Sequence, residues 1–383
     1  MRIGIFGTKQ EAGYLAKCIK QSNIHKMMFF IDNDKNKQGT LIDEINVISA
    51  EQFKHSYRNE TDAVVIAMRG SFSRLTTIYQ LKELQAKRIG VFLFSYSDCN
   101  REINDFERAI VWLDTLDKPF MPYLEYNVTD SCNLKCKGCN HFSNLCEDNI
   151  FADSREFAKD LSYLAQKVSI GQLRLLGGEA LLHKNLMEFI QKAREILPDT
   201  DIYIVTNGLL IPSLDNSFLK EMKRNNIIFD ISRYVPTNVQ YDVICEVLKK
   251  EEVGYHFSDE VIRQFGKTLN IKGNSDVKKS QAACVAKGCR LLKNGKLYKC
   301  SVEGVMNYFT EYFNCKMVEN ERGINIYDTN IDWGVLLDKL YYEPVEMCKF
   351  CAEKCELFEW KVETLPQKED WVVDEAEGSE IRL

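Results

Sequence analysis

The sequence predicts an α/β protein with an N-terminal parallel-sheet domain, a partial (β/α) barrel and a small C-terminal cysteine-rich module. Short apolar runs alternate with helix-length amphipathic segments from residue 2 to residue 257, which is typical of βα units. Nine of the 14 cysteines fall into three short groups between residues 132 and 355. The expected divisions are a sheet domain at 1–100, a linker helix at 101–122, a barrel at 123–275, a metal-stapled module at 276–360 and a tail at 361–383.

The composition excludes several classes of protein. With 45% hydrophobic and 28% charged residues, the 383-residue chain has the make-up of a globular protein. No apolar run approaches the length of a membrane span or a signal peptide, so we expect a cytoplasmic protein without a membrane partner. A net charge of -6 and a pI of about 5.6 argue against a nucleic-acid partner. In a reducing compartment, clustered cysteines indicate metal ligands more often than disulfides.

The N-terminal strands are expected at "RIGIF", "MMFFID", "DAVVIAM" and "GVFLFS", separated by helices such as "EAGYLAKCIKQ" and "TIYQLKELQAK". This pattern resembles the Rossmann-like domains attached to sugar-modifying and surface-polysaccharide enzymes. Asp32 and Asp34 stand where an acidic residue can meet a ribose, but the run from Gly7 to Gly13 lacks the middle glycine of a dinucleotide-binding loop. Nucleotide binding and a scaffold or docking role therefore both remain open.

A helix is predicted over "NDFERAIVWLDTL", and Pro119 and Pro122 mark the boundary that follows it. A second βα series then begins, with strands at "YLEYNVT", "QLRLLGGE", "DIYIVTNG", "IIFDISRY" and "VGYHF". Its polar motifs stand at the C-terminal ends of strands, as in (β/α) barrels. The shorter, Lys-rich and Cys-rich elements from residue 276 indicate a module stapled by metal. The acidic end "DEAEGSEIRL" indicates a solvated tail.

The stretch "CNLKCKGC" places Cys132, Cys136 and Cys139 on one loop directly after a strand. Three thiolates can hold three irons of a cubane cluster and leave the fourth iron without a protein ligand, where chemistry can occur. A structural zinc site with His141 as the fourth ligand is the alternative.

The cysteine loop, followed by "GGE" at the end of the next strand, resembles the radical S-adenosylmethionine (SAM) enzyme family. This resemblance implies a [4Fe-4S] cluster that binds SAM, with the Glu179 carboxylate accepting from the SAM ammonium group. Arg233 or Ser232 would meet the SAM carboxylate, and the two glycines would allow the backbone to approach the methionine moiety. The cofactor-binding residues so implied are Gly177, Gly178, Glu179, Thr206, Asn207, Ser232, Arg233 and Phe142.

One position departs from the family pattern. The family carries an aromatic or bulky residue just before the third cysteine, where it packs on adenine, and this chain has Gly138. Phe142 or His141 could supply that contact instead. For Phe142, ordinary packing under the loop is the alternative.

The C-terminal stretches "CVAKGCRLLKNGKLYKC" and "CKFCAEKC" resemble the auxiliary-cluster modules of the same family, called SPASM with two clusters and twitch with one. Two cubanes need about eight thiolates, and seven cysteines remain here even with Cys315, so one auxiliary [4Fe-4S] cluster is expected. A zinc ribbon is the alternative. The Asn-Gly pair predicts a hairpin that presents two of the cysteines. The expected ligands are Cys289, Cys300, Cys348 and Cys351, with Cys284 or Cys355 as substitutes.

The resemblance implies reductive cleavage of SAM to a 5'-deoxyadenosyl radical that removes hydrogen from a substrate. An auxiliary cluster that accepts an electron favours oxidation by dehydrogenation. Epimerisation is the alternative, with the Cys146 thiol as a candidate hydrogen donor. The parallel N-terminal domain favours a small molecule or nucleotide-linked sugar over a peptide substrate. The resemblance also implies a reducing partner such as flavodoxin or ferredoxin. The rival from another class is a non-enzymatic zinc or iron-sulfur protein with a redox or binding role.

Overall fold

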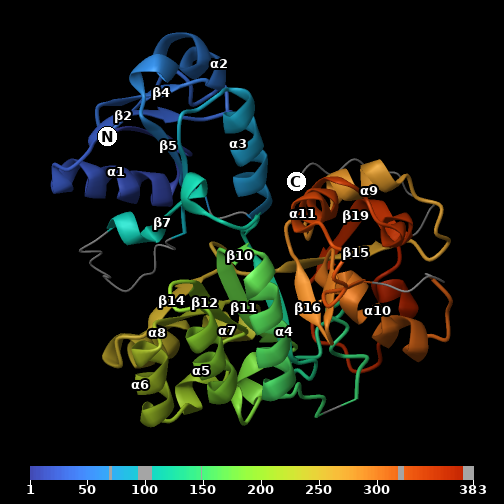
Figure 1. Cartoon of the computed structure of the whole chain (residues 1–383). Helices are drawn as coiled ribbons and strands as arrows, with labels where there is room; N and C mark the ends of the chain where they lie inside the picture. The colour runs from blue at the N-terminus through green and yellow to red at the C-terminus, as the bar shows by residue number, and fades with distance from the viewer. Residues whose placement is uncertain (69–70, 94–105, 148, 318–322, 374–383) are drawn as a thin grey trace. The chain divides into compact units, whose positions relative to one another are not determined.

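A computed structural model of the protein describes residues 1–68, 71–93, 106–147, 149–317 and 323–373 (Figure 1). Contacts divide the chain into two compact units. Unit 1 comprises Met1–Tyr123 with Lys167–Gln172, and unit 2 comprises Leu124–Gln166 with Leu173–Leu383. Both units are α/β, as predicted. None of the helices in the described ranges is long and apolar enough to cross a membrane.

Unit 1 is built on a sheet with the strand order β3-β4-β2-β1-β5-β6-β7. The inner strands run parallel, whereas β3 and β7 are antiparallel edge strands. The expected apolar runs therefore all lie in this sheet. Its strands are β1 (Arg2–Phe6), β2 (Lys26–Ile31), β3 (Leu41–Ile42), β4 (Ile45–Ile48), β5 (Ala63–Ile66), β6 (Ile89–Phe92) and β7 (Ile110–Trp112); its helices are α1 (Gln10–Ser22), α2 (Ala50–Gln52) and α3 (Ser71–Glu83).

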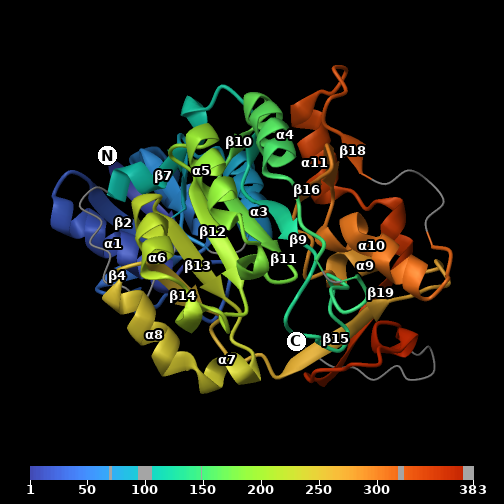
Figure 2. The same ribbon diagram turned by 90° about the horizontal axis from the view of Figure 1, so that it is seen from below.

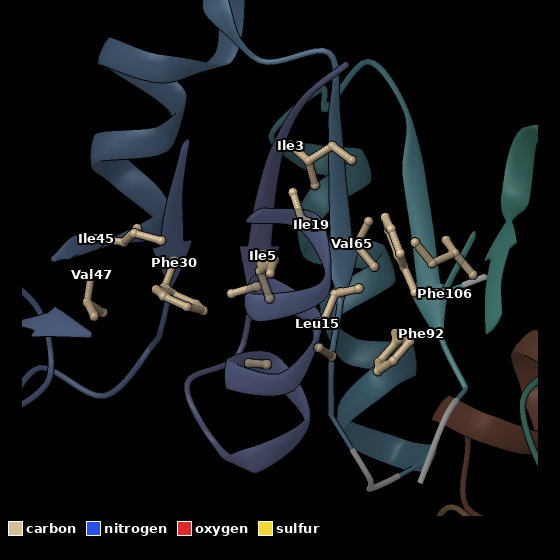
Figure 3. Packing of buried hydrophobic residues seen from close by; sticks show 14 residues of the cluster. Ile3, Ile5, Leu15, Ile19, Phe30, Ile45, Val47, Val65, Phe92 and Phe106 are labelled. Carbon is tan, nitrogen blue, oxygen red and sulfur yellow. The ribbon is translucent and has the colours of Figure 1, made fainter. Parts of the chain in front are cut away.

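Helices cover both faces of this sheet because successive residues of each strand point to opposite sides. On one face, Leu15 and Ile19 of α1 pack against Ile3, Ile5 and Phe30 (Figure 3). On the other face, α3 contributes a second cluster that includes Ile78, Leu81, Phe6 and Ile31. The Rossmann-like arrangement is confirmed. A further short pair, β8 (Phe120–Met121) with β10 (Ser169–Ile170), completes unit 1.

The helix predicted over "NDFERAIVWLDTL" is wrong within the described residues, which begin at Phe106. This segment forms edge strand β7 between two short 3-10 turns. A Cβ on Gly90 of β6 would come within 2.9 Å of both the Ile110 and Trp112 side chains, so these residues pack directly onto β6. Ile, Val and Trp favour strands, and pairing with the free edge of β6 decides their conformation. Cys99 lies outside the described residues.

Unit 2 begins with strands in the order β14-β13-β12-β11-β9, the expected partial barrel (Figures 1 and 2). Tyr126 of β9 packs edge-on against Phe157 of α4, with ring centroids 4.6 Å apart, so one side of the sheet is covered by helices. The alternate residues Glu125 and Asn127 face the other side. The strands are β9 (Leu124–Thr129), β11 (Gln172–Gly177), β12 (Asp201–Thr206), β13 (Ile227–Ile231) and β14 (Gly254–Phe257); the helices are α4 (Ser154–Lys167), α5 (Leu186–Ile196), α6 (Asn216–Arg224), α7 (Val235–Val239) and α8 (Tyr241–Lys250).

The cysteine-rich module lies within unit 2 and extends the same sheet. The predicted Asn-Gly hairpin is present: Asn294 and Gly295 have φ angles of 51° and 69° between β16 (Leu291–Lys293) and β17 (Lys296–Tyr298). Strand β16 pairs in parallel with β9. The other elements are β15 (Gln264–Leu269) antiparallel to β19 (Cys351–Glu359), as Figure 2 shows, with β18 (Ile324–Asn325), α9 (Val277–Ala283), α10 (Ser301–Tyr312) and α11 (Trp333–Tyr342).

The acidic end "DEAEGSEIRL", predicted to be a solvated tail, lies outside the described residues, which end at residue 373. The earlier part of the predicted tail, from residue 361 to residue 373, packs against the rest of unit 2. Trp371 is fully buried and shares a hydrophobic cluster with Phe142, Phe309 and Met306. A single large indole in an otherwise polar stretch is enough to fix this segment, because its burial contributes roughly 2–3 kcal/mol. The segment around Trp371 therefore packs beneath the cysteine loop.

Candidate functional site

The three loop cysteines leave the C-terminal end of β9 together and lie within electrostatic reach of one another. Burial raises the pKa of all three thiols, that of Cys136 to about 12, and the charge of Cys139 raises the pKa of Cys132 and Cys136 further. Buried thiolates need a nearby cation or metal, so this donor set fits an iron-sulfur cluster. Within the described ranges, no group of three His, Cys, Asp or Glu side chains is placed to hold a single metal ion.

Glu179 is the centre of a buried hydrogen-bond network. Its carboxylate accepts from the Thr206 hydroxyl and the Asn207 backbone N–H, both at 2.7 Å, and from the Leu181 N–H at 3.0 Å. Burial raises the pKa of Glu179, while these donors oppose the rise. Its charge in turn raises the pKa of Cys132. The structure therefore brings three of the predicted SAM-binding residues together beside the cysteine loop.

Asn133 joins this network to the cysteine loop, and sequence reasoning missed it. The Asn207 amide donates to the Asn133 side-chain oxygen at 2.7 Å. Asn207 therefore orients the loop, in addition to any contact with the ribose of SAM. The available signal was its position, since Asn133 directly follows Cys132 within the motif.

Gly177 and Gly178 have a role that differs from the predicted approach to SAM. A Cβ on Gly177, which has a φ of 139°, would lie 1.7 Å from the Thr129 carbonyl oxygen. A Cβ on Gly178 would lie 2.2 Å from the Ser131 carbonyl oxygen. Without side chains, the Gly178 and Glu179 N–H groups donate to these two carbonyls at 2.9 Å. The glycines thus let the GGE segment lie directly against the start of the cysteine loop.

Ser232 and Arg233 directly follow β13, and they are held by different contacts: Ser232 through its backbone and Arg233 through its side chain. The Ser232 N–H donates to the Thr206 carbonyl at 2.9 Å, which holds the two strand ends together. The Arg233 guanidinium donates to Asn238 at 2.8 Å and lies over the Tyr241 ring at 4.5 Å. It is thereby held against α7 and α8, and its contact with the SAM carboxylate stays a prediction.

The adenine contact predicted for Phe142 is not supported. Its ring is 1% exposed and packs against Phe309 and Trp371, with centroids 5.6 and 6.0 Å away, which is the packing alternative. His141 is buried, burial lowers its pKa, and its Nδ1 has no hydrogen-bond partner among the described residues. Gly138 has a structural reason: its Cβ would meet the Phe358 ring at 2.6 Å.

Cys146, the candidate hydrogen donor, lies beside a polar network at the start of the loop. Its Sγ donates to the Asp130 carbonyl at 3.1 Å. The Asp130 carboxylate accepts from Lys293 and Tyr308, both at 2.6 Å, and from Asn127 at 2.8 Å. Lys293 and Tyr308 also line a pocket of about 340 Å³. A role for Cys146 in hydrogen transfer stays a prediction.

The module cysteines group differently from the expected set. Cys284 raises the pKa of Cys300, Cys348 and Cys351, although burial is the largest cause in each case. The pKa of Cys289 is raised first by burial and then by Glu125 of β9, with a smaller effect of Cys300. Cys284 thus interacts with three of the other thiols and is a candidate for the fourth ligand, while the set expected from the sequence stays a prediction. None of the described cysteines forms a disulfide.

Two buried cations lie beside this second cysteine set. Arg290 is wholly buried and donates to the backbone carbonyl of Lys299 at 2.7 Å. Lys299 donates to the carbonyl of Leu340 at 2.6 Å, and burial together with the charge of Arg290 lowers its pKa to about 8. A cubane with four thiolate ligands is anionic, so these two charges fit a cluster at this site.

A third set of polar side chains lies on strands β11, β13 and β14 of unit 2. Arg174 of β11 and His256 of β14 both contact the Asp230 carboxylate of β13, with the His256 Nε2 at 2.8 Å. Burial alone would raise the pKa of Asp230, but Arg174 and His256 outweigh it and hold the pKa well below its usual value. The three side chains are 13–17% exposed, so they are largely shielded from solvent.

Comparisons with known proteins agree with this site. Residues 126–240 match the model of the Radical SAM superfamily. The GTP 3',8-cyclase of Alkaliphilus oremlandii is 35% identical over 111 residues, which cover 28% of this chain and 34% of that protein. The GTP 3',8-cyclase of Sulfurovum sp. is 31% identical over 134 residues, covering 33% and 40%. The chain thus spans between a third and two fifths of the length of these relatives.

Solved structures resemble the chain at a lower level. BtrN in complex with AdoMet and 2-DOIA has a TM-score of 0.39 and 20% identity, covering 67% of this chain and all of that one. The structure of anSMEcpe with bound AdoMet has a TM-score of 0.29 and 18% identity, covering 36% and 44%. Residues 126–240 of the chain therefore form a domain that matches the Radical SAM superfamily.

Proposed function

We propose that this protein is a radical SAM oxidoreductase that dehydrogenates a polar small molecule and passes one substrate electron to an auxiliary [4Fe-4S] cluster. One observation carries the proposal: the Glu179 network joins the GGE segment to the cysteine loop, while a second buried cysteine set with its own cations lies in the same compact unit. A zinc or redox-sensing protein has no need of a buried carboxylate beside the loop.

The cysteine loop and Glu179 have separate roles in this reaction. When bound, the loop cluster supplies the electron that cleaves SAM to methionine and a 5'-deoxyadenosyl radical, which takes a hydrogen atom from a substrate carbon. The Glu179 carboxylate has about four lone-pair sites. Three of them are used by Thr206, Leu181 and Asn207, which leaves one for the SAM ammonium. Thr206 and Asn207 keep this carboxylate ionised and aimed by donating to it.

The substrate radical must lose a proton and one electron to become a carbonyl compound. Cys284, Cys300, Cys348 and Cys351 would hold the auxiliary cluster, which would supply the acceptor for that electron. The Asp230 set offers a proton acceptor in His256, whose Nε2 is held by the Asp230 carboxylate and whose Nδ1 has no hydrogen-bond partner among the described residues. Arg174 offers a cationic partner for a substrate oxygen. Water exclusion at this depth strengthens both interactions. A reductant such as flavodoxin or ferredoxin and a cytoplasmic location belong to this proposal.

Two substrate classes fit the chain. A nucleotide-linked sugar suits the polar interior of unit 2, and Rossmann-like domains such as unit 1 occur in sugar-modifying enzymes. GTP is the second candidate, because the curated relatives are named GTP 3',8-cyclases, although the match covers only about a third of this chain. Epimerisation, with Cys146 as hydrogen donor, and peptide modification remain alternatives to dehydrogenation.

The test is an anaerobic assay of reduced protein with SAM. We expect 5'-deoxyadenosine in the absence of substrate, and faster formation with the true substrate. A substrate deuterated at the reacting carbon should place deuterium in 5'-deoxyadenosine, and a carbonyl product should appear. Nucleotide sugars and GTP are tested in parallel. Absence of 5'-deoxyadenosine after prolonged incubation of iron-loaded protein would exclude the enzyme.

Replacing Cys284 by serine should remove the auxiliary cluster and lower the iron content from about eight to about four atoms per chain. The reason is that Cys284 lies among the other three thiols of the set, whereas Cys289 contacts Glu125. Cys289→Ser is the matched control and should retain about eight irons. Iron loss in Cys289→Ser with full iron in Cys284→Ser would restore the assignment made from the sequence.

A further inference from the structure

The last two residues of β19 and the segment that follows cross the cysteine loop, and this segment pairs with the loop backbone. We call residues 358–372 the C-terminal clamp. Cys136 forms an antiparallel bridge with Val362. The Lys137 N–H donates to the Lys361 carbonyl at 2.9 Å, and the Glu363 N–H donates to the Lys135 carbonyl at 2.8 Å. The clamp therefore extends the middle of the cysteine loop as a short strand pair.

Side chains of the clamp fix the same loop at three further points. The Phe358 ring fills the space where a side chain at position 138 would stand. Lys137 forms an ion pair with Asp370 at 3.1 Å. The Trp371 indole donates to the Cys139 carbonyl at 2.9 Å. These contacts leave little freedom for the loop to shift relative to the clamp.

Trp360 is the clamp residue whose polar atom has no assigned role. It is 9% exposed, and its ring stacks on Tyr234 with centroids 5.5 Å apart and planes at 25°. Its Nε1 is buried and has no hydrogen-bond partner in the part of the chain that the structure describes. A buried indole N–H without a partner is costly, so it indicates an acceptor that becomes available when the neighbouring loop binds its cluster.

Cys136 lies close to this part of the clamp, because it forms the bridge with Val362, two residues after Trp360. Burial is the main cause that raises the pKa of Cys136, and the Trp360 indole opposes that rise, as a donor next to the sulfur does. Tyr234, which stacks on Trp360, also lies near the loop, since burial and then the charges of Cys136, Cys139 and Cys132 raise its pKa. Trp360 and Tyr234 thus form an aromatic wall beside the sulfur atoms.

We propose that the Trp360 indole N–H donates a hydrogen bond to the Cys136 sulfur once that sulfur ligates iron, and that this bond raises the reduction potential of the SAM-binding cluster. The clamp holds the indole in place for this purpose. A donor beside a cluster sulfur stabilises the reduced form, which carries one more negative charge. The inference rests on the proposed function, since it requires a cluster in the loop.

The clamp also connects the two cysteine sets. Strand β19 starts at Cys351, an auxiliary ligand, and the chain reaches Trp360 directly after its last residue, Glu359. A change in the auxiliary site that moves β19 is therefore transmitted to the indole beside Cys136. Within the described stretch 351–360, no helix lies between Cys351 and Trp360, so the clamp follows the auxiliary ligands directly in the sequence.

The test is the midpoint potential of the SAM-binding cluster in anaerobic Trp360→Phe, followed by EPR and identified by the change of its signal on adding SAM. We expect a shift to more negative potential and slower 5'-deoxyadenosine formation with a weak reductant. Trp333→Phe, in α11, is the matched control and should keep the wild-type potential. An unchanged potential in iron-replete Trp360→Phe would overturn the inference and leave the proposed function intact.

A second measurement needs no variant. Wild-type protein with ¹⁵N-labelled indole should show a ¹⁵N coupling to the reduced cluster in pulsed EPR, and no coupling would overturn the inference. A wild-type loop that takes up zinc without iron would overturn the proposed function itself, and this inference with it.

Discussion

Replacing Cys132, Cys136 and Cys139 together by alanine should lower the iron content from about eight to about four atoms per chain and abolish formation of 5'-deoxyadenosine. The three thiols are the iron donors of the loop, and burial raises the pKa of each. A loop without these thiols loses its ligands for a cluster. The auxiliary set lies on other elements and should stay loaded. The expected loss of SAM cleavage is complete, because the open iron is lost with its ligands.

Iron, acid-labile sulfide and zinc are measured on anaerobic protein, with 5'-deoxyadenosine in the same samples. Cys18→Ala, a half-buried thiol on α1 of unit 1, is the matched control and should keep wild-type values. Stoichiometric zinc with little iron in the wild type would contradict the cluster and make the loop a structural staple. Unchanged iron in the triple variant would place both clusters elsewhere.

The βα order was predictable because each strand is a short apolar run bounded by a longer amphipathic one, and parallel strands bring their ends to one edge. This places the cysteine loop, the GGE segment and Thr206 together without any knowledge of side-chain contacts. The helix expected at residues 104–116 failed for the opposite reason. Its apolar core "IVW" is too short to show a period, and its pairing with β6 is a tertiary contact.

The site details that were not predictable depend on distant residues. Spacing alone does not distinguish Cys284 from Cys289, and the difference comes from Glu125 on β9. The burial of Phe142 depends on Trp371, near the end of the described chain. Both Trp360 and Trp371 stand in a stretch that reads as polar, so the clamp had no pattern in the sequence. Gly138 was noticed as a departure, but Phe358 gives its reason.

Replacing Asp230 by asparagine should destabilise unit 2 by about 3 kcal/mol at neutral pH, because a neutral amide removes the charge that pairs with the largely buried Arg174 guanidinium. His256 loses the same carboxylate partner. The pKa of Asp230 is depressed in the folded state, so its contribution is fully present above its unfolded pKa of about 3.9. The contribution is lost as the pH falls towards the lower, folded pKa.

The difference between wild type and Asp230→Asn should therefore be constant from about pH 5 to pH 8 and shrink below about pH 4. The measurement is the urea midpoint of the unit 2 transition across that range. Asp62→Asn is the matched control: Asp62 pairs with Arg2 at 2.9 Å, but both side chains are well exposed, so its effect should be far smaller. Equal midpoints for Asp230→Asn and wild type at pH 7 would show that the Arg174 charge is solvated without Asp230. The polar set would then be an open, water-filled surface, and the proton-accepting role proposed for it would lose its physical basis.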